Sequence, residues 1–113
     1  MRWMRTTVVS LALCALGAVA FPNPALAWSG QVSGVIFELD VTDGNDFGLR
    51  VFLPVTSMCG TSTPNWAYLN SSDSNYSTYA AALMMAKATS EGVTIFSNVD
   101  SSGYCHIGYV AFQ

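Results

Sequence analysis

The sequence predicts a small, mainly β domain with one helix, and three observations support this fold class. Residues 76–91, YSTYAAALMMAKATSE, form the only run that is long and continuous enough to be a helix. The segments on both sides of this run alternate apolar and polar residues, as β-strands do. A hydrophobic leader precedes them, and the rest of the 113-residue chain is short enough for one domain.

The first 27 residues are predicted to be a signal peptide. Two arginines precede an apolar run at residues 8–21, and residues 25–27, Ala-Leu-Ala, form a small-x-small cleavage site. The apolar run is short for a membrane span. We therefore expect an exported protein, periplasmic or secreted, that is not inserted in the membrane after cleavage. Residues 28–113 should fold as a single domain.

Five segments have the pattern of strands: residues 31–42, 47–53, 66–70, 93–99 and 104–112. In the first segment four apolar side chains share a face that we expect to be buried, namely Val35, Phe37, Leu39 and Val41. Residues 43–46, Asp-Gly-Asn-Asp, are a strong turn signal, so the first two strands are predicted to pair as a hairpin. Phe47 should begin the buried face of the second strand.

The predicted helix has one clear apolar face, formed at three- and four-residue spacing by Tyr76, Tyr79, Ala80, Leu83 and Ala86. Residues 73–75 offer side-chain oxygens to its first amides, and Gly92 is placed to end it in a left-handed conformation. The opposite face, with Met84 and Met85, is also largely apolar. Either the domain itself accommodates this face with a few exposed side chains, or the face contacts another copy of the chain.

The predicted element order is β-β-β-α-β-β, with one helix between the third and fourth strands. This is the order of the OB-fold, a small five-stranded Greek-key barrel. In such a barrel the helix would close one open end. A β-sandwich or another α+β arrangement with the same element order is the alternative.

Two cysteines, Cys59 and Cys105, remain after the predicted cleavage. An even pair in an exported protein indicates a disulfide. Closing so long a loop would stabilise the fold by about 4 kcal/mol in the chain-entropy treatment. The alternatives are two free thiols or a pair of metal ligands, which a single histidine and the lack of a CxxC motif do not favour.

Residues 28–113 contain seven carboxylates but only two cations, Arg50 and Lys87, which gives a formal charge of −5. A chain without a basic patch cannot neutralise phosphates, so nucleic acid is excluded as a partner. Neutral partners, such as sugars or protein surfaces, fit this charge better.

No catalytic, metal-binding or cofactor-binding site is predicted. Residues 40–46 are acidic but lack the spacing and closing Glu of a calcium loop, so they fit a solvated turn. His106 follows Cys105 in a strand, where adjacent side chains point to opposite faces, so a Cys-His nucleophile is not expected. Glu38 and Asp40 share a strand face, but nothing nearby supplies the apolar pocket that would raise one pKa for acid–base chemistry.

The aromatic residues are the best indication of function. Tyr and Trp combine an apolar ring with a polar group, which suits exposed recognition surfaces. In an OB-type barrel, ligands bind on the face of strands 2 and 3 and on the loops 1–2 and 4–5. Four residues of that face are therefore predicted to bind a ligand: Arg50, Phe52, Trp66 and Tyr68. The corresponding loops are residues 43–46 and 100–103.

Several local patterns together resemble a known group of proteins. Trp28-Ser29-Gly30 begins the mature chain, a cysteine precedes the third strand, and a helix-Gly-strand unit carries Leu83, Ala86, Gly92, Val93 and Ile95. In these features the chain is similar to small exported bacterial OB-fold proteins and to the receptor-binding B subunits of subtilase-type and typhoid-type AB5 toxins.

This resemblance implies a ring-shaped pentamer, with the helices lining a central pore, that binds sialylated glycans. The Tyr-Tyr-Ser segment that binds sugar in those subunits has no counterpart in residues 31–36, QVSGVI, so no sugar-binding residue can be carried over. The leading hypothesis is an exported, non-enzymatic module that binds a glycan or a cell surface. The alternative is a periplasmic structural or inhibitor protein that binds another protein.

Overall fold

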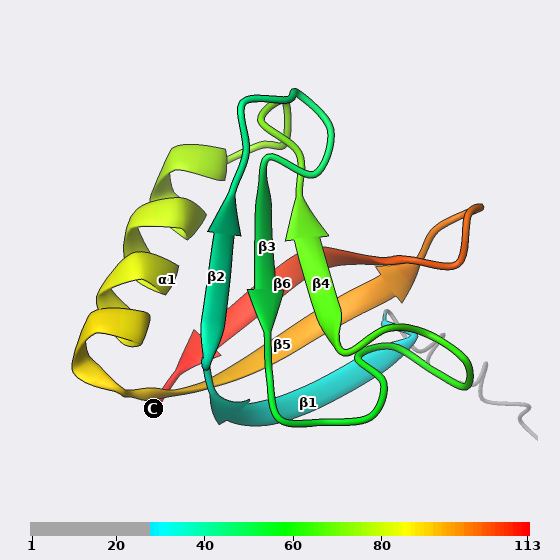
Figure 1. The fold of residues 1–113 in the computed structure, drawn as a ribbon, viewed down its shortest axis with the longest axis horizontal. Coiled ribbons are helices and arrows are strands. Elements are labelled where there is room, and N and C mark those ends of the chain that lie inside the picture. Colours follow the sequence, from blue (N-terminus) through cyan, green and yellow to red (C-terminus); the bar gives the residue numbers. More distant parts are fainter. Residues whose placement is uncertain (1–27) are drawn as a thin grey trace, which may run out of the picture.

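The computed structural model describes residues 28–113 and shows a mostly β fold with one helix (Figure 1). In chain order the elements are β1 (Gly30–Val35), β2 (Glu38–Val41), β3 (Leu49–Phe52), β4 (Trp66–Leu69), α1 (Tyr76–Thr89), β5 (Gly92–Val99) and β6 (Cys105–Phe112). The predicted signal peptide, residues 1–27, lies outside the described residues. Within the described part of the chain, no helix is long and apolar enough to cross a membrane.

The strands form one six-stranded sheet in the order β1-β5-β6-β4-β3-β2. Neighbouring strands are antiparallel except β4 and β6, which run parallel. These two strands meet only at Ala67↔Cys105 and Tyr68↔His106, and we call this short pairing the β4–β6 junction. Figure 1 shows β2, β3 and β4 crossing over β1, β5 and β6, with α1 beside β2.

The first predicted strand was wrong in two respects. Residues 31–42 form two strands, so the sheet has six strands instead of five. β1 pairs with β5 and β2 pairs with β3, and the chain changes partner between them. The break also changes which side chains are buried. Ile36 is only 2% exposed, whereas Val35, Phe37 and Val41, which were predicted to be buried, are 43%, 50% and 62% exposed.

The predicted hairpin is confirmed, because β2 and β3 pair antiparallel on either side of the turn at residues 43–46. The core lies between the two halves of the sheet and under α1. Its large aliphatic side chains are almost completely buried: Leu49, Val51, Leu53, Leu69, Leu83, Val93, Ile95 and Ile107. Alternate residues of β3, β4 and β6 enter this core, so the residues between them point to the other face of the sheet.

The buried face of α1 is confirmed. Ala80, Leu83 and Ala86 are buried, and Tyr76 and Tyr79 pack against the core. The other face of α1 is open to solvent, where Met84 and Met85 are 45% and 66% exposed.

Both ends of α1 differ from the prediction. Asn75 precedes the helix with φ 63° and makes no side-chain cap. At the other end Ser90, rather than Gly92, takes the left-handed conformation, with φ 56°. The amides of Ser90 and Glu91 donate to carbonyls of the last helical turn at 3.4 and 3.0 Å. These paired backbone bonds end the helix, so Gly92 is free to begin β5.

Cys59 and Cys105 form the predicted disulfide, with their Cα atoms 5.7 Å apart. The bond joins the loop after β3 to the first residue of β6, and both cysteines are buried. Since Cys105 is also paired with Ala67, the disulfide holds β6 at the β4–β6 junction.

The first described residues are packed closely against this region. A side chain at Gly30 would overlap Cys59 Cα and the Met58 carbonyl oxygen, and one at Gly108 would overlap the ring of Trp28. Both glycines are therefore required by close packing rather than by backbone conformation.

Replacing both Cys59 and Cys105 by alanine is predicted to lower the free energy of unfolding by about 4 kcal/mol, because the loop between them is no longer closed in the unfolded chain. Urea denaturation of the oxidised protein and of the double variant would measure the difference. The wild-type protein with its disulfide reduced is the control, and it should unfold near the midpoint of the variant. A loss below about 1 kcal/mol would contradict the stabilising role.

Candidate functional site

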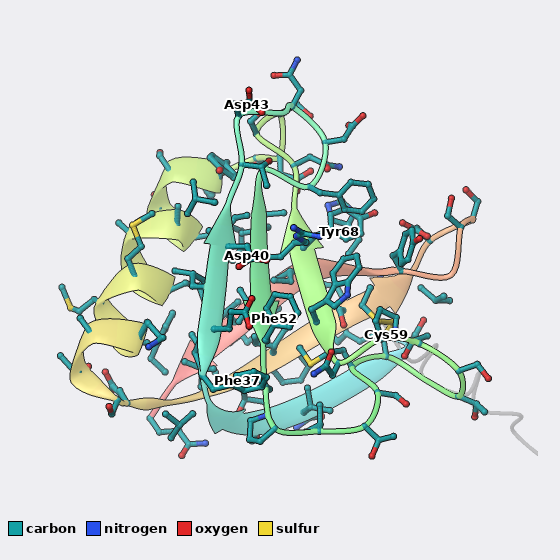
Figure 2. All side chains as sticks on the ribbon, in the orientation of Figure 1. Phe37, Asp40, Asp43, Phe52, Cys59 and Tyr68 are labelled. Atoms are coloured by element: carbon teal, nitrogen blue, oxygen red, sulfur yellow. A yellow bond between two sulfur atoms is a disulfide. The ribbon has the colours of Figure 1, made fainter. Side chains whose placement is uncertain are left out.

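The candidate site lies on the outer face of β3 and β4. In β3, Leu49 and Val51 are fully buried, so Arg50 and Phe52 point outward. In β4, Ala67 and Leu69 are fully buried, and Trp66 lies on the same outer face as Phe52, with ring centroids 6.4 Å apart. The structure therefore brings three of the four predicted ligand-binding residues, Arg50, Phe52 and Trp66, onto one surface. Figure 2 shows Phe52 of β3 and Tyr68 of β4 among the side chains of the domain.

Tyr68, the fourth predicted residue, lies on the same face but deeper. It is only 5% exposed, and its ring is stacked on His106 at 4.9 Å with an interplanar angle of 5°. The β4–β6 junction pairs these two residues directly. Tyr68 therefore packs beneath the exposed side chains of this surface, and its hydroxyl is available for a hydrogen bond.

The strand β6 and the residue before it extend this surface. Because Cys105 and Ile107 are buried, Tyr104 and His106 point outward together. Tyr104 stacks on Trp66 with ring centroids 5.1 Å apart and planes at 27°. We call six connected rings the aromatic face: Phe47, Phe52, Trp66, Tyr68, Tyr104 and His106. Phe37, 50% exposed, extends it beyond Phe52, with ring centroids 6.1 Å apart.

Phe47 was predicted to begin the buried face of β3, and this prediction is wrong. Phe47 has φ 56°, and its amide donates to the side chain of Asn70 at 2.9 Å, so its backbone turns away from the strand direction. Its ring contacts the outer rings instead, 4.3 Å from Tyr68 and edge-on to Tyr104 at 5.7 Å. A left-handed backbone at a large side chain is uncommon, and such residues often lie at functional sites.

Two carboxylates anchor the buried end of the aromatic face. The Tyr68 hydroxyl donates to Asp100 at 2.6 Å, and His106 Nε2 lies 2.7 Å from Asp73 Oδ2. Burial raises the pKa of the Tyr68 hydroxyl well above its usual range, and the hydrogen bond and charge of Asp100 add to the effect. Burial acts to raise the pKa of Asp100 as well, but hydrogen bonds from Tyr68 and from the amides of its own turn outweigh it, so this pKa is lowered.

Arg50 provides the positive charge of the site. Its guanidinium lies 5.5 Å from the centre of the Trp66 ring, and Nη2 is 3.3 Å from Asp40 Oδ2. Within residues 28–113 its buried Nε has no hydrogen-bond partner. Asp40 also interacts with Glu38. A shared hydrogen bond with Asp40, some desolvation and the Asp40 charge together raise the pKa of Glu38, while Arg50 opposes the shift.

A cleft of about 280 Å³ opens beside these residues, lined by Thr42, Asp46, Phe47, Arg50, Trp66 and Tyr104. Its walls come from the β2–β3 turn, from β3 and β4, and from the end of the β5–β6 turn. It combines two kinds of surface, rings that can stack on a ligand and polar atoms that can orient it. The two turns that border it are those that the sequence indicated.

Sequence reasoning did not place Phe47, Tyr104 or His106 on this surface. His106 could have been found, because a disulfide cysteine at position 105 points inward and its strand neighbour must then point outward. The position of Phe47 depends on one left-handed residue before β3, for which the sequence contains no glycine signal.

The arrangement does not assemble the metal sites considered from the sequence. Among residues 28–113, no group of three or more potential metal ligands lies together. Cys105 is held in the disulfide, and His106 points to the opposite face of β6. The acidic residues at positions 40–46 belong to β2 and the hairpin turn.

Comparisons of this chain with protein-family models, with characterised proteins and with solved structures found no match.

Replacing Tyr68 by phenylalanine is predicted to cost about 1–2 kcal/mol of stability at neutral pH, because Asp100 loses a hydrogen bond to its charged form. The pKa of Asp100 is lowered in the folded state, so this stabilisation is complete above its usual value of 3.8 and is lost as the pH falls below it. Denaturation of wild type and variant at pH 7 and at about pH 2.5 would measure the difference in their free energies of unfolding, which should be smaller at the lower pH.

Tyr109→Phe, at an exposed tyrosine of β6, is the matched control and should cost almost nothing at either pH. An equal cost of Tyr68→Phe at both pH values would show that Asp100 is not the partner that matters.

Proposed function

We propose that the protein is an exported, non-enzymatic binding module whose aromatic face and cleft take a glycan, on a cell surface or in solution. The observation that carries the proposal is the cleft itself, where three partly exposed rings adjoin one cation, one carboxylate and two hydroxyls. A sugar ring has apolar C–H faces that stack on aromatic rings, and hydroxyls that both donate and accept hydrogen bonds. The cleft volume of about 280 Å³ suits one such ring.

The pairing of the ionisable groups supports binding rather than catalysis. Tyr68 is bonded to Asp100, His106 to Asp73, and Arg50 to Asp40. Groups held in this way keep their rings and charges in fixed positions, which reduces the entropy lost when a ligand binds. The disulfide supports export, since such bonds persist in oxidising compartments.

The finer fold that we propose is an OB-like barrel. β1 and β2 are separated by two residues in the chain, yet they lie at the two ends of the strand order. If they are taken as one bent strand, the sheet returns on itself and five strands remain in the predicted order, with α1 before the fourth. In such a barrel Phe52, Trp66 and Tyr68 of the aromatic face lie on strands 2 and 3, His106 lies on strand 5, and the two turns lie at the border of the face.

Replacing Tyr104 by alanine is predicted to weaken glycan binding by at least about tenfold, because a stacked ring that lines the cleft is removed. A glycan array would identify a ligand, and calorimetry on wild type and variant would measure the change. Tyr109→Ala, which removes a 52% exposed tyrosine outside this cleft, is the control and should bind normally. The proposal would be abandoned if no glycan bound, or if both variants bound like wild type.

A second candidate partner is a protein, and the protein that we consider is a second copy of this chain. Met84 and Met85 are exposed on α1, and Val41, 62% exposed, lies on β2, the strand beside this helix. Exposed apolar side chains on one helix face, such as Met84 and Met85, are typical of association sites. We propose that this helix face mediates a homo-oligomer.

The double variant Met84→Glu, Met85→Glu is predicted to be a monomer, because two carboxylates would have to be buried in the interface. Size exclusion with light scattering would compare it with wild type, which should be oligomeric. Val99→Glu changes an exposed valine at the end of β5 and should leave the oligomer intact. A monomeric wild-type protein would rule out this interface.

A further inference from the structure

The charges of the described chain are concentrated on one side. Six of the seven carboxylates of residues 28–113 lie on β2 or in the turns and loop around the aromatic face: Glu38, Asp40, Asp43, Asp46, Asp73 and Asp100. The seventh, Glu91, follows α1. Of the two cations, only Arg50 is on this side, and Lys87 is on the helix. The cleft is therefore set in a negative surface.

This negative charge is only partly neutralised by local pairs. Arg50 offsets Asp40, and His106 lies against Asp73. Asp46, in the wall of the cleft, has no such partner among the described residues. The charges also act at the aromatic face, because Asp46, Asp73 and Asp100 all oppose ionisation of the Tyr68 hydroxyl.

We propose that the cleft selects uncharged glycans and rejects anionic ones. This inference rests on the proposed glycan-binding function and adds its specificity. It differs from what the resemblance to toxin B subunits implies, which is a sialylated ligand.

Hydrogen-bond chemistry favours the same choice. A sugar hydroxyl can donate to the Asp46 carboxylate and accept from the Arg50 guanidinium, two groups that line the same cleft. A sialic acid carboxylate or a sulfate can only accept, so it satisfies Arg50 but repels Asp46. Arg50 is already paired with Asp40 at 3.3 Å, so a neighbouring carboxylate offsets its attraction for an anion.

The experiment is a glycan array of matched pairs, each an uncharged oligosaccharide and the same oligosaccharide with a terminal sialic acid, followed by calorimetry on the best pair. The uncharged member is expected to bind at least about tenfold more tightly, as like-charge contacts at an interface require. Equal or tighter binding of the sialylated member would overturn the specificity but leave the glycan-binding function standing. Binding of neither member would overturn both.

Ionic strength gives an independent reading. Raising salt from about 0.01 M to about 1 M shortens the screening length from about 30 Å to about 3 Å, so the affinity for the sialylated member should rise while that for the uncharged member stays constant. A fall in sialylated affinity with salt would show a positive site and contradict the inference.

A pair of charge variants locates the effect. Asp43 is next to Thr42, a lining residue of the cleft. Asp43→Asn is therefore expected to lower the ratio of the affinity for the uncharged member to that for the sialylated member by about two- to fourfold. Glu91→Gln removes one carboxylate beyond α1 and should leave the preference unchanged. Equal effects of the two variants would show that net charge, rather than the charge around the cleft, sets the specificity.

Discussion

The β4–β6 junction is the constraint on which the rest of the structure depends. Two residue pairs, Ala67↔Cys105 and Tyr68↔His106, connect the half of the sheet that contains β2, β3 and β4 to the half that contains β5 and β1. So short a parallel pairing is weak by itself. The disulfide from Cys59 fixes β6 at this point, because Cys105 belongs to both the bond and the junction. The same contact places the Tyr68 and His106 rings against each other.

Side chains alternate between the two faces of the sheet at this junction, so one face belongs to the core and the other to the candidate site. On one face of the junction Ala67, Cys105 and Ile107 are buried in the core. On the other, Tyr68 and His106 are stacked and hydrogen-bonded to Asp100 and Asp73. Since a buried polar group is costly without a partner, Asp100 is what makes the hydroxyl of the buried Tyr68 stable at this depth. Asp73 holds the partly exposed ring of His106 in place. The exposed rings and the cleft are supported by this layer.

The sequence predicted what depends on local pattern. The helix and its buried face, the hairpin and the pairing of the two cysteines follow from periodicity, from turn residues and from the even number of cysteines after residue 27. The site residues Arg50, Phe52, Trp66 and Tyr68 were placed by strand alternation together with the element order, and they do share one face. Their role as ligand contacts stays a prediction.

What the sequence could not predict depends on single backbone conformations. Residues 31–42 alternate without interruption, yet the chain changes partner after Val35, because β1 and β2 pair with strands on different halves of the sheet. Phe47 and Ser90 adopt left-handed conformations without the glycine that usually marks them. At these positions tertiary contacts overrode the local pattern, and at Phe47 the result is a ring in the site instead of the core.

In the function that we propose, residues from both sides of the β4–β6 junction form one binding surface. The most direct test of this shared surface is an NMR titration. Isotope-labelled protein is titrated with an oligosaccharide that binds it, and the amide chemical shifts are followed. Amide shifts are expected at Arg50 and Trp66 on one side of the junction and at Tyr104 and His106 on the other, with little change along α1. Shifts confined to α1, or to only one side of the junction, would contradict the proposal.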